Sequence, residues 1–307
     1  MRITSGKDAL DWLGRSTGIT TRHLDIVPMR GSTSSSMLLV QCSRGANLQR
    51  FVLRVLDNPG WLAEEPDLAA HEAAALEEAD KAGLPAPKLV AYSAHDVGFG
   101  APVVLMSFIE GRIELCPSDF PQWLRGLAGQ LAFIHQHSAN AFPWRFRSWV
   151  QKSTLMPPKW TRVAHLWEQA IEVVLGLEPG PEPDNHAVFI HRDYHPTNVL
   201  WRQGAVSGVV DWINACRGPA GVDVAHCRTN LALMFGVAAA DQFLDAYREV
   251  APRFTYIPYW DLDSILDMCL PAPSFYAPWE EFGLSIIAPE ILRQRVDAHL
   301  KSVMMRT

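Results

Sequence analysis

A hairpin flanked by polar residues constrains the fold of this chain more than any other feature of its sequence. Residues 199–212, VLWRQGAVSGVVDW, are two β-rich runs around a Gln-Gly pair that is typical of a tight turn. Such a turn makes the second strand run back beside the first. We therefore expect Asn198, which precedes the first strand, and Asp211, at the end of the second, to lie close together beside Asp193.

The ten residues that lead into this hairpin, HRDYHPTNVL (191–200), are compatible with three kinds of chemistry. Alternate residues of an extended segment share one face, so His191, Asp193 and His195 could bind a metal together. An aspartate beside a histidine could also be a general base with the residue that orients it. In phosphoryl transfer, Asp193 would be the base and Asn198 a magnesium ligand.

The rest of the chain favours phosphoryl transfer. Magnesium prefers hard oxygen ligands, which Asn198 and Asp211 supply. A histidine-based metal site would need another ligand, for which His226 is the nearby candidate, and would leave both of these residues without a role. A hydrolase dyad would need a nucleophile, yet the chain has no G-x-S-x-G elbow. The plain alternative is that polar residues here only cap a turn. It explains a single aspartate more easily than the combined spacing of Asp193, Asn198 and Asp211.

Two motifs carry a resemblance to a known family. HRDYHPTNVL is similar to the catalytic loop of the aminoglycoside phosphotransferase and choline kinase family, which are small-molecule kinases with a protein-kinase-like fold. VVDW with the later GPAGVDVAH (218–226) resembles the metal-binding aspartate segment of that family. The resemblance extends from about Gly31 to about Val250. It departs from the family pattern at Arg192, where Gly is usual, and we expect this arginine to form a local salt bridge.

The resemblance implies roles for individual residues. Asp193 would be the catalytic base, Asn198 and Asp211 would hold Mg²⁺, and Asp223 would brace the catalytic loop. We expect His191 to support the same loop by packing and hydrogen bonding. A protein kinase is disfavoured, because the chain lacks D-F-G and A-P-E and has no room for an activation segment between its two later aspartates.

The nucleotide site is predicted upstream, around Arg54, on the strand where this fold usually carries a phosphate-binding Lys or Arg. In the next helix Glu72 interrupts an apolar stripe, so its carboxylate should have a partner. We expect an Arg54–Glu72 pair that resembles the Lys–Glu pair of kinases, unless the helix is rotated and Glu72 is solvated. Further candidates come from the loop RGSTSSS, which resembles a Gly-rich loop, and from the strand before Gly111: Gly31, Ser34, Ser35, Met106, Ser107 and Ile109.

We predict an α+β, protein-kinase-like fold with two lobes. Residues 1–110 would form a nucleotide-binding N-lobe, with an antiparallel sheet and one main helix, and residues 111–307 a mainly helical C-lobe with the catalytic loop, metal site and acceptor site. The expected elements are a helix capped at Ser5, a hairpin of Met37–Gln41 with Phe51–Leu56, a helix over Ala63–Ala82, a strand over Ala101–Ile109, helices over Phe120–His137 and Trp160–Leu175, and a surface loop over Gly176–Asn185.

Bulk composition excludes several classes of protein. The net charge of −6 over 307 residues disfavours a nucleic-acid binder, which needs a basic surface. The five cysteines are scattered without a C-x-x-C pair, so we expect reduced core residues. Neither a signal sequence nor an apolar run long enough to span a membrane is present, and the expected location is the cytoplasm. Nothing in the sequence indicates an oligomeric state.

The expected reaction moves the γ-phosphoryl group of ATP or GTP, with Mg²⁺, to a hydroxyl of a small molecule such as an aminoglycoside-like antibiotic. Choline, a macrolide or another metabolite alcohol are alternative acceptors, and a catalytically silent nucleotide-binding pseudokinase is an alternative of another class. The C-terminal part mixes aromatic and acidic residues that could hold a cationic acceptor, although core packing and solvated helix ends explain them as well. Its candidates are Asp261, Asp263, Glu280 and Glu281.

Overall fold

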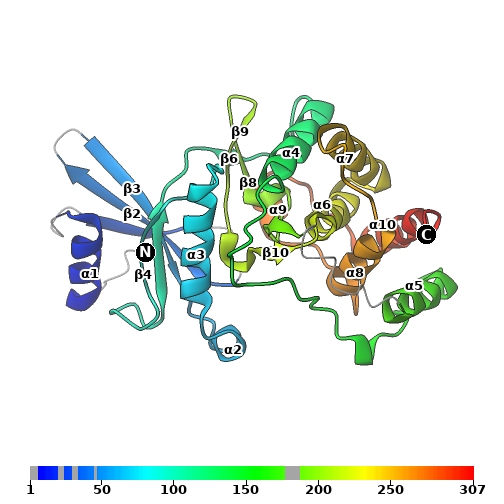
Figure 1. Ribbon diagram of the computed structural model, residues 1–307, viewed down its shortest axis with the longest axis horizontal. Helices are drawn as coiled ribbons and strands as arrows, with labels where there is room; N and C mark the ends of the chain where they lie inside the picture. The colour runs from blue at the N-terminus through cyan, green and yellow to red at the C-terminus, as the bar shows by residue number, and fades with distance from the viewer. Residues whose placement is uncertain (1–5, 20–23, 30–33, 45–46, 177–186) are drawn as a thin grey trace. The chain divides into compact units, whose positions relative to one another are not determined.

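The computed structural model describes residues 6–19, 24–29, 34–44, 47–176 and 187–307 (Figure 1). The chain divides into two compact units. The first contains Met1–Gly111 and Ser207–Asn214, and the second contains Arg112–Val206 and Ala215–Thr307. The sequence-based division assigned the whole chain after residue 110 to one lobe. The structure differs at Ser207–Asn214, the segment that carries Asp211, because these residues pack with the first unit.

The first unit is built on a five-stranded antiparallel sheet of order β1-β2-β3-β5-β4. The predicted hairpin is confirmed and is longer than expected, since its pairing runs from Ser36–Val55 to Arg44–Asn47. The strands are β1 (Leu24–Pro28), β2 (Ser36–Arg44), β3 (Asn47–Val55), β4 (Leu89–Ser93) and β5 (Val103–Ser107).

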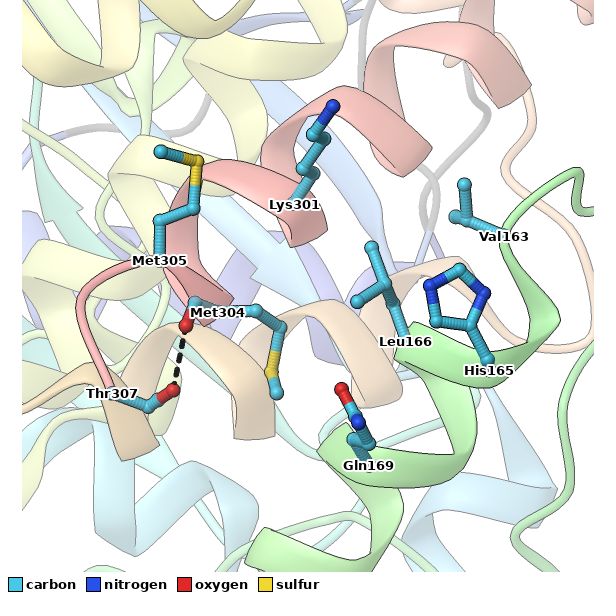
Figure 2. A pocket seen from close by; sticks show the side chains of 8 residues that line it. All are labelled: Val163, His165, Leu166, Gln169, Lys301, Met304, Met305 and Thr307. Atoms are coloured by element: carbon cyan, nitrogen blue, oxygen red, sulfur yellow. Dashed lines mark hydrogen bonds between the residues drawn. The ribbon is translucent and has the colours of Figure 1, made fainter.

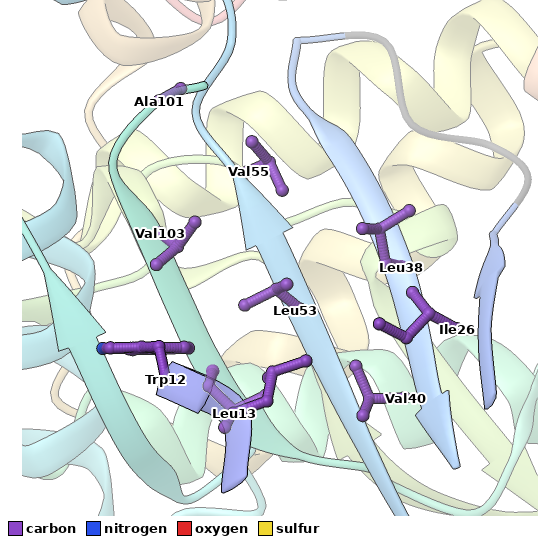
Figure 3. Close-up of a cluster of buried hydrophobic side chains, with 10 residues drawn as sticks. Trp12, Leu13, Ile26, Leu38, Val40, Leu53, Val55, Ala101 and Val103 are labelled. Carbon is purple, nitrogen blue, oxygen red and sulfur yellow. The ribbon is translucent and has the colours of Figure 1, made fainter. Parts of the chain in front are cut away.

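One face of this sheet packs against helix α1 (Lys7–Thr17), which contributes Trp12 and Leu13 to a buried apolar cluster (Figure 3). From β3 the cluster takes Leu53 and Val55. Because alternate residues of a strand point to opposite faces, Arg54 between them points away from this cluster. The alternation of β3 therefore places Arg54 on the face where α3 packs.

The single helix predicted over residues 63–82 is wrong, because the chain forms two helices there. They are α2 (Pro59–Glu64) and α3 (Leu68–Lys81). The break has a local cause: Pro66 disfavours helical backbone in the preceding residue, and Glu65 has φ −131° and ψ 81°. The predicted cap at Ser5 lies outside the described residues, and the structure places Gly6 at the N-cap of α1.

The second unit is mainly helical, so the predicted α+β class with an antiparallel sheet is confirmed. Its central helix, α6, is buried on every side from Gly221 to Met234. Among the described residues, no helix is both long and apolar enough to cross a membrane. The helices are α4 (Phe120–Ile134), α5 (Ala164–Gly176), α6 (Ala220–Phe235), α7 (Val237–Val250), α8 (Pro258–Cys269), α9 (Pro278–Glu281) and α10 (Pro289–Met304). The predicted loop over residues 176–185 falls almost entirely outside the described residues.

Short strands frame the loops that carry the polar motifs. The second predicted hairpin is confirmed, since β8 and β9 are neighbours in one sheet and are joined by Gln203 and Gly204 with φ of 53° and 78°. Positive φ at both central residues is what a two-residue hairpin turn requires. These strands are β6 (Arg112–Ile113), β7 (Val188–Ile190), β8 (Val199–Arg202), β9 (Ala205–Val209) and β10 (Cys216–Gly218).

A pocket of about 420 Å³ lies between α5 and the end of α10 in the second unit (Figure 2). Apolar and polar side chains line it in equal number, and none of the candidate site residues is among them. The lining residues are Val163, His165, Leu166, Gln169, Lys301, Met304, Met305 and Thr307. We assign no catalytic role to this pocket.

Two glycines of α4 provide a matched test of how tightly the second unit is packed. A Cβ at Gly126 would lie 2.5 Å from the ring of Trp201, whereas a Cβ at Gly129 would meet nothing within 4 Å. We expect Gly126→Ala to destabilise the protein by about 1–3 kcal/mol through overpacking. Gly129→Ala should stabilise it by roughly 0.5–1 kcal/mol, because alanine has the higher helix propensity. Urea unfolding midpoints measure both, and equal shifts in the two variants would contradict the packing described.

Candidate active site

The carboxylate of Asp193 lies between two histidines in the second unit. Its Oδ1 is 3.0 Å from Nε2 of His226, on α6, and 3.4 Å from Nε2 of His195, in its own loop. The side-chain amide of Asn198 donates to the backbone carbonyl of Asp193 at 2.9 Å. Burial acts to raise the pKa of Asp193, but the two imidazoles outweigh it and hold that pKa well below its usual value. This carboxylate is therefore ionised at neutral pH.

Asp223, in the first turn of α6, fixes the backbone of the loop that carries Asp193. Its two oxygens accept the backbone N–H groups of His191 and Arg192, each at 2.7 Å. The same carboxylate is 3.1 Å from Nε2 of His135, whose other ring nitrogen is 2.6 Å from the hydroxyl of Tyr247. Burial acts to raise the pKa of Asp223, and the contact with His135 outweighs it and lowers that pKa. The fully buried carboxylate is thus compensated by donors on three sides.

Arg192 adopts a strained backbone and stacks on aromatic rings. Its φ is 71°, and its guanidinium carbon lies 3.8 Å from the ring centroid of Trp149 and 4.8 Å from that of Phe146. The local salt bridge expected from the sequence is replaced, within the described part of the chain, by this cation–π stacking. The hydrogen bond from the backbone N–H of Arg192 to Asp223 stabilises this strained backbone conformation.

Arg54 is the centre of a second polar cluster, which lies in the first unit. Its Nε is 2.9 Å from Oε2 of Glu72, so the ion pair expected from the apolar stripe is present. Its Nη2 donates to Oδ1 of Asp211 at 2.8 Å, and its Nη1 donates to the hydroxyl of Ser35 at 2.9 Å. Both Arg54 and Glu72 are buried, and the stripe of α3 that holds Glu72 faces inward as predicted.

The two acids of this cluster share one guanidinium, that of Arg54. Burial acts to lower the pKa of Arg54, but Asp211 and Glu72 together outweigh burial and raise it. Burial, with a contribution from the negative charge of Asp211, raises the pKa of Glu72 to about 7, because Arg54 offsets only part of this rise. Arg54 therefore stays charged and is held by both acids.

The two predicted magnesium ligands belong to different units. Asp211 lies in the first unit, with a φ of 69° that is rare for a residue with a side chain. Asn198 lies in the second unit, and its amide nitrogen is already used within the loop. Their joint action on a metal ion remains a prediction.

The other residues predicted for the nucleotide site differ in burial and in whether their backbone groups are already hydrogen-bonded. The N–H of Ser107 donates to the carbonyl oxygen of Lys88 at 2.8 Å, so this amide is occupied within the sheet. Met106 is buried in β5, and Ile109 is half-buried. Ser34 is half-buried beside Ser35, and Gly31 lies outside the described residues.

The acceptor candidates separate into structural and accessible acids. Asp261 is fully buried, lies 3.0 Å from Nε of the fully buried Arg228 and accepts a hydrogen bond from Tyr256, so its assignment to the acceptor site is corrected to a structural role. Asp263 is buried and accepts the hydroxyl of Ser148 at 2.7 Å. The sequence-based list also included two acids that are exposed on α9, namely Glu280 and Glu281.

One acid whose charge environment includes Asp193 was missed by the sequence analysis. Asp267 lies one helical turn after Asp263 on α8, and burial raises its pKa, while the charges of Arg192, His226 and Asp193 also act on it. Its spacing of four residues from Asp263 was a visible signal, because residues at that spacing share one face of a helix. His226 was considered only as a metal ligand, and its contact with Asp193 could not be read from the sequence.

Comparisons with known proteins bear on the family to which the chain is similar. The model of the phosphotransferase enzyme family matches residues 25–257. A homoserine kinase from Chelativorans sp. (strain BNC1) is 31% identical over 143 residues, which cover 42% of this chain and 41% of that relative. The chain thus matches less than half the length of that homoserine kinase.

Several solved structures share the fold. A macrolide 2′-phosphotransferase from Brachybacterium faecium superposes with a TM-score of 0.58 at 18% identity, covering 95% of this chain and 98% of the other. An aminoglycoside phosphotransferase in a ternary complex with ADP and hygromycin B gives 0.62 at 16% identity, with coverages of 96% and 99%. A choline kinase from Cryptosporidium parvum Iowa II gives 0.58 at 12% identity, with coverages of 97% and 95%.

The buried pair of the first unit can be tested by stability alone. Arg54 supplies the opposite charge that the carboxylate of Glu72 meets within the described residues. We expect Arg54→Met to cost about 3–5 kcal/mol, because it leaves a buried charge without its partner. The double variant Arg54→Met, Glu72→Leu should recover more than half of that loss. Urea unfolding of the wild type, of each single variant (Arg54→Met and Glu72→Leu) and of the double variant measures this, and a double variant destabilised by the sum of the two singles would refute the pairing.

Proposed function

The chain belongs to the phosphotransferase enzyme family, and from that premise we propose that it transfers the γ-phosphoryl group of ATP or GTP to a hydroxyl group of a small molecule. The observation that carries the proposal is the carboxylate of Asp193, which lies between two imidazoles on a loop whose backbone is bonded to Asp223. A small-molecule kinase needs a fixed acceptor for the hydroxyl proton, and Asp193 has that chemistry.

A carboxylate with a lowered pKa is a weak base, yet it suits this reaction. The transition state of phosphoryl transfer is loose in most analyses, so the hydroxyl loses its proton late and needs orientation more than activation. The contacts of Asp193 with His226 and Asn198 fix its position. Asp193 would accept a hydrogen bond from the acceptor hydroxyl and take its proton as the new bond forms.

Mg²⁺ is the proposed metal, with Asn198 and Asp211 as its protein ligands. The donor types fit, because a side-chain amide oxygen and a carboxylate are hard oxygen ligands. The amide nitrogen of Asn198 is bonded to the carbonyl of Asp193, which leaves its oxygen as the ligand atom. When bound, the ion would neutralise phosphate charge during transfer.

The phosphates of the nucleotide are assigned to Arg54, with Ser34, Ser35 and the loop at Gly31. The guanidinium is held on both sides by acids, so it is oriented before the nucleotide binds. As an arginine it can contact phosphate oxygens in pairs, which a lysine cannot. Met106 and Ile109 are proposed beside the base, and the occupied amide of Ser107 is less suited to it. ATP and GTP are both retained as donors, and the proposed compartment is the cytoplasm.

The acceptor is proposed to be a small alcohol that carries a cationic group. The charge of Arg192 acts on both Asp263 and Asp267 of α8, and that of Asp193 acts on Asp267. Glu280 and Glu281, which are exposed on α9, are further proposed contacts for a cation. An aminoglycoside-like acceptor fits this charge, as do choline, a macrolide amine or an amino-acid alcohol such as homoserine, the last suggested by the homoserine kinase relative. A silent pseudokinase is less favoured, because the proposed base and both proposed ligands are present.

The test is transfer across a panel of aminoglycosides, macrolides, choline and homoserine, with each nucleotide and with Mg²⁺. We expect Asp193→Asn to lower kcat by about 10²–10⁴-fold, because the proton acceptor is lost, with little change in nucleotide affinity. Asp245→Asn, at an exposed position of α7, is the matched control and should behave as wild type.

Two outcomes would contradict the proposal. Full transfer activity in Asp193→Asn would remove Asp193 as the base. Tight nucleotide binding by the wild type, with neither transfer nor slow hydrolysis for any member of the panel, would favour the pseudokinase.

A further inference from the structure

Three side chains of the second unit form a cluster whose composition goes beyond what phosphoryl transfer requires. They are the carboxylate of Asp193 and the imidazoles of His195 and His226, whose ligand-type atoms all lie within 4.8 Å of one another. We propose that this cluster binds one divalent transition-metal ion of the zinc class, and that the bound ion blocks Asp193. The site is separate in composition from the Asn198 and Asp211 pair proposed for Mg²⁺.

The distances suit a tetrahedral ion. Zinc binds imidazole nitrogen at about 2.0–2.1 Å and carboxylate oxygen at about 2.0–2.2 Å, so two ligand atoms of a tetrahedral site lie roughly 3.3 Å apart. Oδ1 of Asp193 is 3.0 Å from Nε2 of His226 and 3.4 Å from Nε2 of His195. Two of the three edges are therefore near the required length, and the third, between the two imidazoles, is at most 4.8 Å.

The chemistry of the three ligands selects against magnesium. Two imidazoles with one carboxylate form a borderline-soft set that holds zinc and other first-row transition metals. Magnesium prefers oxygen ligands and keeps several of its waters, so it has little affinity for such a set. With three protein ligands, a fourth position on the ion remains for water.

The cluster is held in place by contacts that do not depend on a metal. Asp193 and His195 lie in the loop whose backbone is bonded to Asp223, and His226 is three residues after Asp223 on α6. The side chains are 26%, 12% and 9% exposed for Asp193, His195 and His226, so the carboxylate provides the route from solvent. The site is thus preformed and accessible on one side.

His195 also has the outer partner that metal-binding histidines need. Its Nδ1 is 2.7 Å from the hydroxyl of Thr197, a contact that fixes the ring and directs Nε2 toward Asp193. The amide nitrogen of Asn198 is 3.2 Å from the same Nε2, so an ion entering the cluster displaces that contact. Occupation of the cluster would therefore change both the proposed base and the neighbouring proposed magnesium ligand.

The inhibitory half of the inference rests on the proposed function, whereas the binding half does not. An ion on Oδ1 of Asp193 would occupy the lone pairs that the acceptor hydroxyl needs. Zinc would then lower the transfer rate at concentrations far below those of Mg²⁺. Excess Mg²⁺ would not restore the rate, and a zinc chelator would.

Binding is tested on the nucleotide-free full chain, stripped of metal, by titration with Zn²⁺ and with Co²⁺ as a visible probe. We expect one ion per chain, with the intense visible absorption of tetrahedral cobalt. His195→Ala and His226→Ala should each weaken binding by more than about 100-fold, since loss of a ligand exceeds the effect of an outer partner. His95→Ala, at an exposed histidine of the first unit, is the matched control and should bind as wild type.

His226→Cys keeps a zinc-type ligand and guards against a folding artefact in the alanine variants. It should retain cobalt binding and add a thiolate-to-cobalt charge-transfer band that the wild type lacks. Unchanged affinity in both alanine variants would show adventitious binding at other histidines and overturn the site. Absence of a one-to-one complex below millimolar metal would overturn it as well. Binding without zinc inhibition of an active wild-type enzyme would overturn only the inhibitory half.

Discussion

The loop that carries Asp193 depends on the hydrogen bonds that the carboxylate of Asp223 accepts from its backbone. The carboxylate accepts the N–H groups of His191 and Arg192 at 2.7 Å each, and through them it holds a loop in which Arg192 has positive φ. Left-handed backbone costs an ordinary residue about 1–2 kcal/mol, so the loop needs such a brace. Two charge-assisted hydrogen bonds to a buried carboxylate contribute enough free energy to offset this cost.

One helix supplies both the brace of the loop and a contact to Asp193, the proposed base. Asp223 and His226 are three residues apart on α6, a spacing that places them on the same face. The first accepts hydrogen bonds from the successive backbone N–H groups of His191 and Arg192, and the second contacts the side chain of Asp193. Because α6 is buried on every side, neither residue can move without repacking the unit.

The first unit holds its own polar centre by similar means. The alternation of β3 sends Leu53 and Val55 into the apolar cluster and Arg54 away from it, and α3 presents Glu72 from an otherwise apolar stripe. Arg54 then joins Glu72 to Asp211. The alternation of the strand and the periodicity of the helix, both visible in the sequence, thus bring Arg54 and Glu72 together as an ion pair.

Local pattern explains which features could be predicted. The hairpin at residues 199–212 follows from strand propensity and a Gln-Gly turn, and the Arg54–Glu72 pair follows from a charge in an apolar stripe. The helix break at Pro66 was also a local signal, and an Ala/Leu/Glu-rich composition concealed it. The structural role of Asp261 could not be found in this way, because its partner Arg228 is 33 residues away and meets it only when α6 packs on α8. The same holds for His226 beside Asp193, a contact between two elements that only the packed fold creates.

The central claim is direct transfer of a phosphoryl group from a nucleotide to an alcohol. A ³¹P NMR time course of the wild-type chain with ATP, Mg²⁺ and pooled alcohol acceptors tests it most directly. Direct transfer predicts a phosphomonoester resonance that grows in step with the β-phosphate resonance of ADP. Formation of ADP with only inorganic phosphate, whatever alcohol is present, would contradict it.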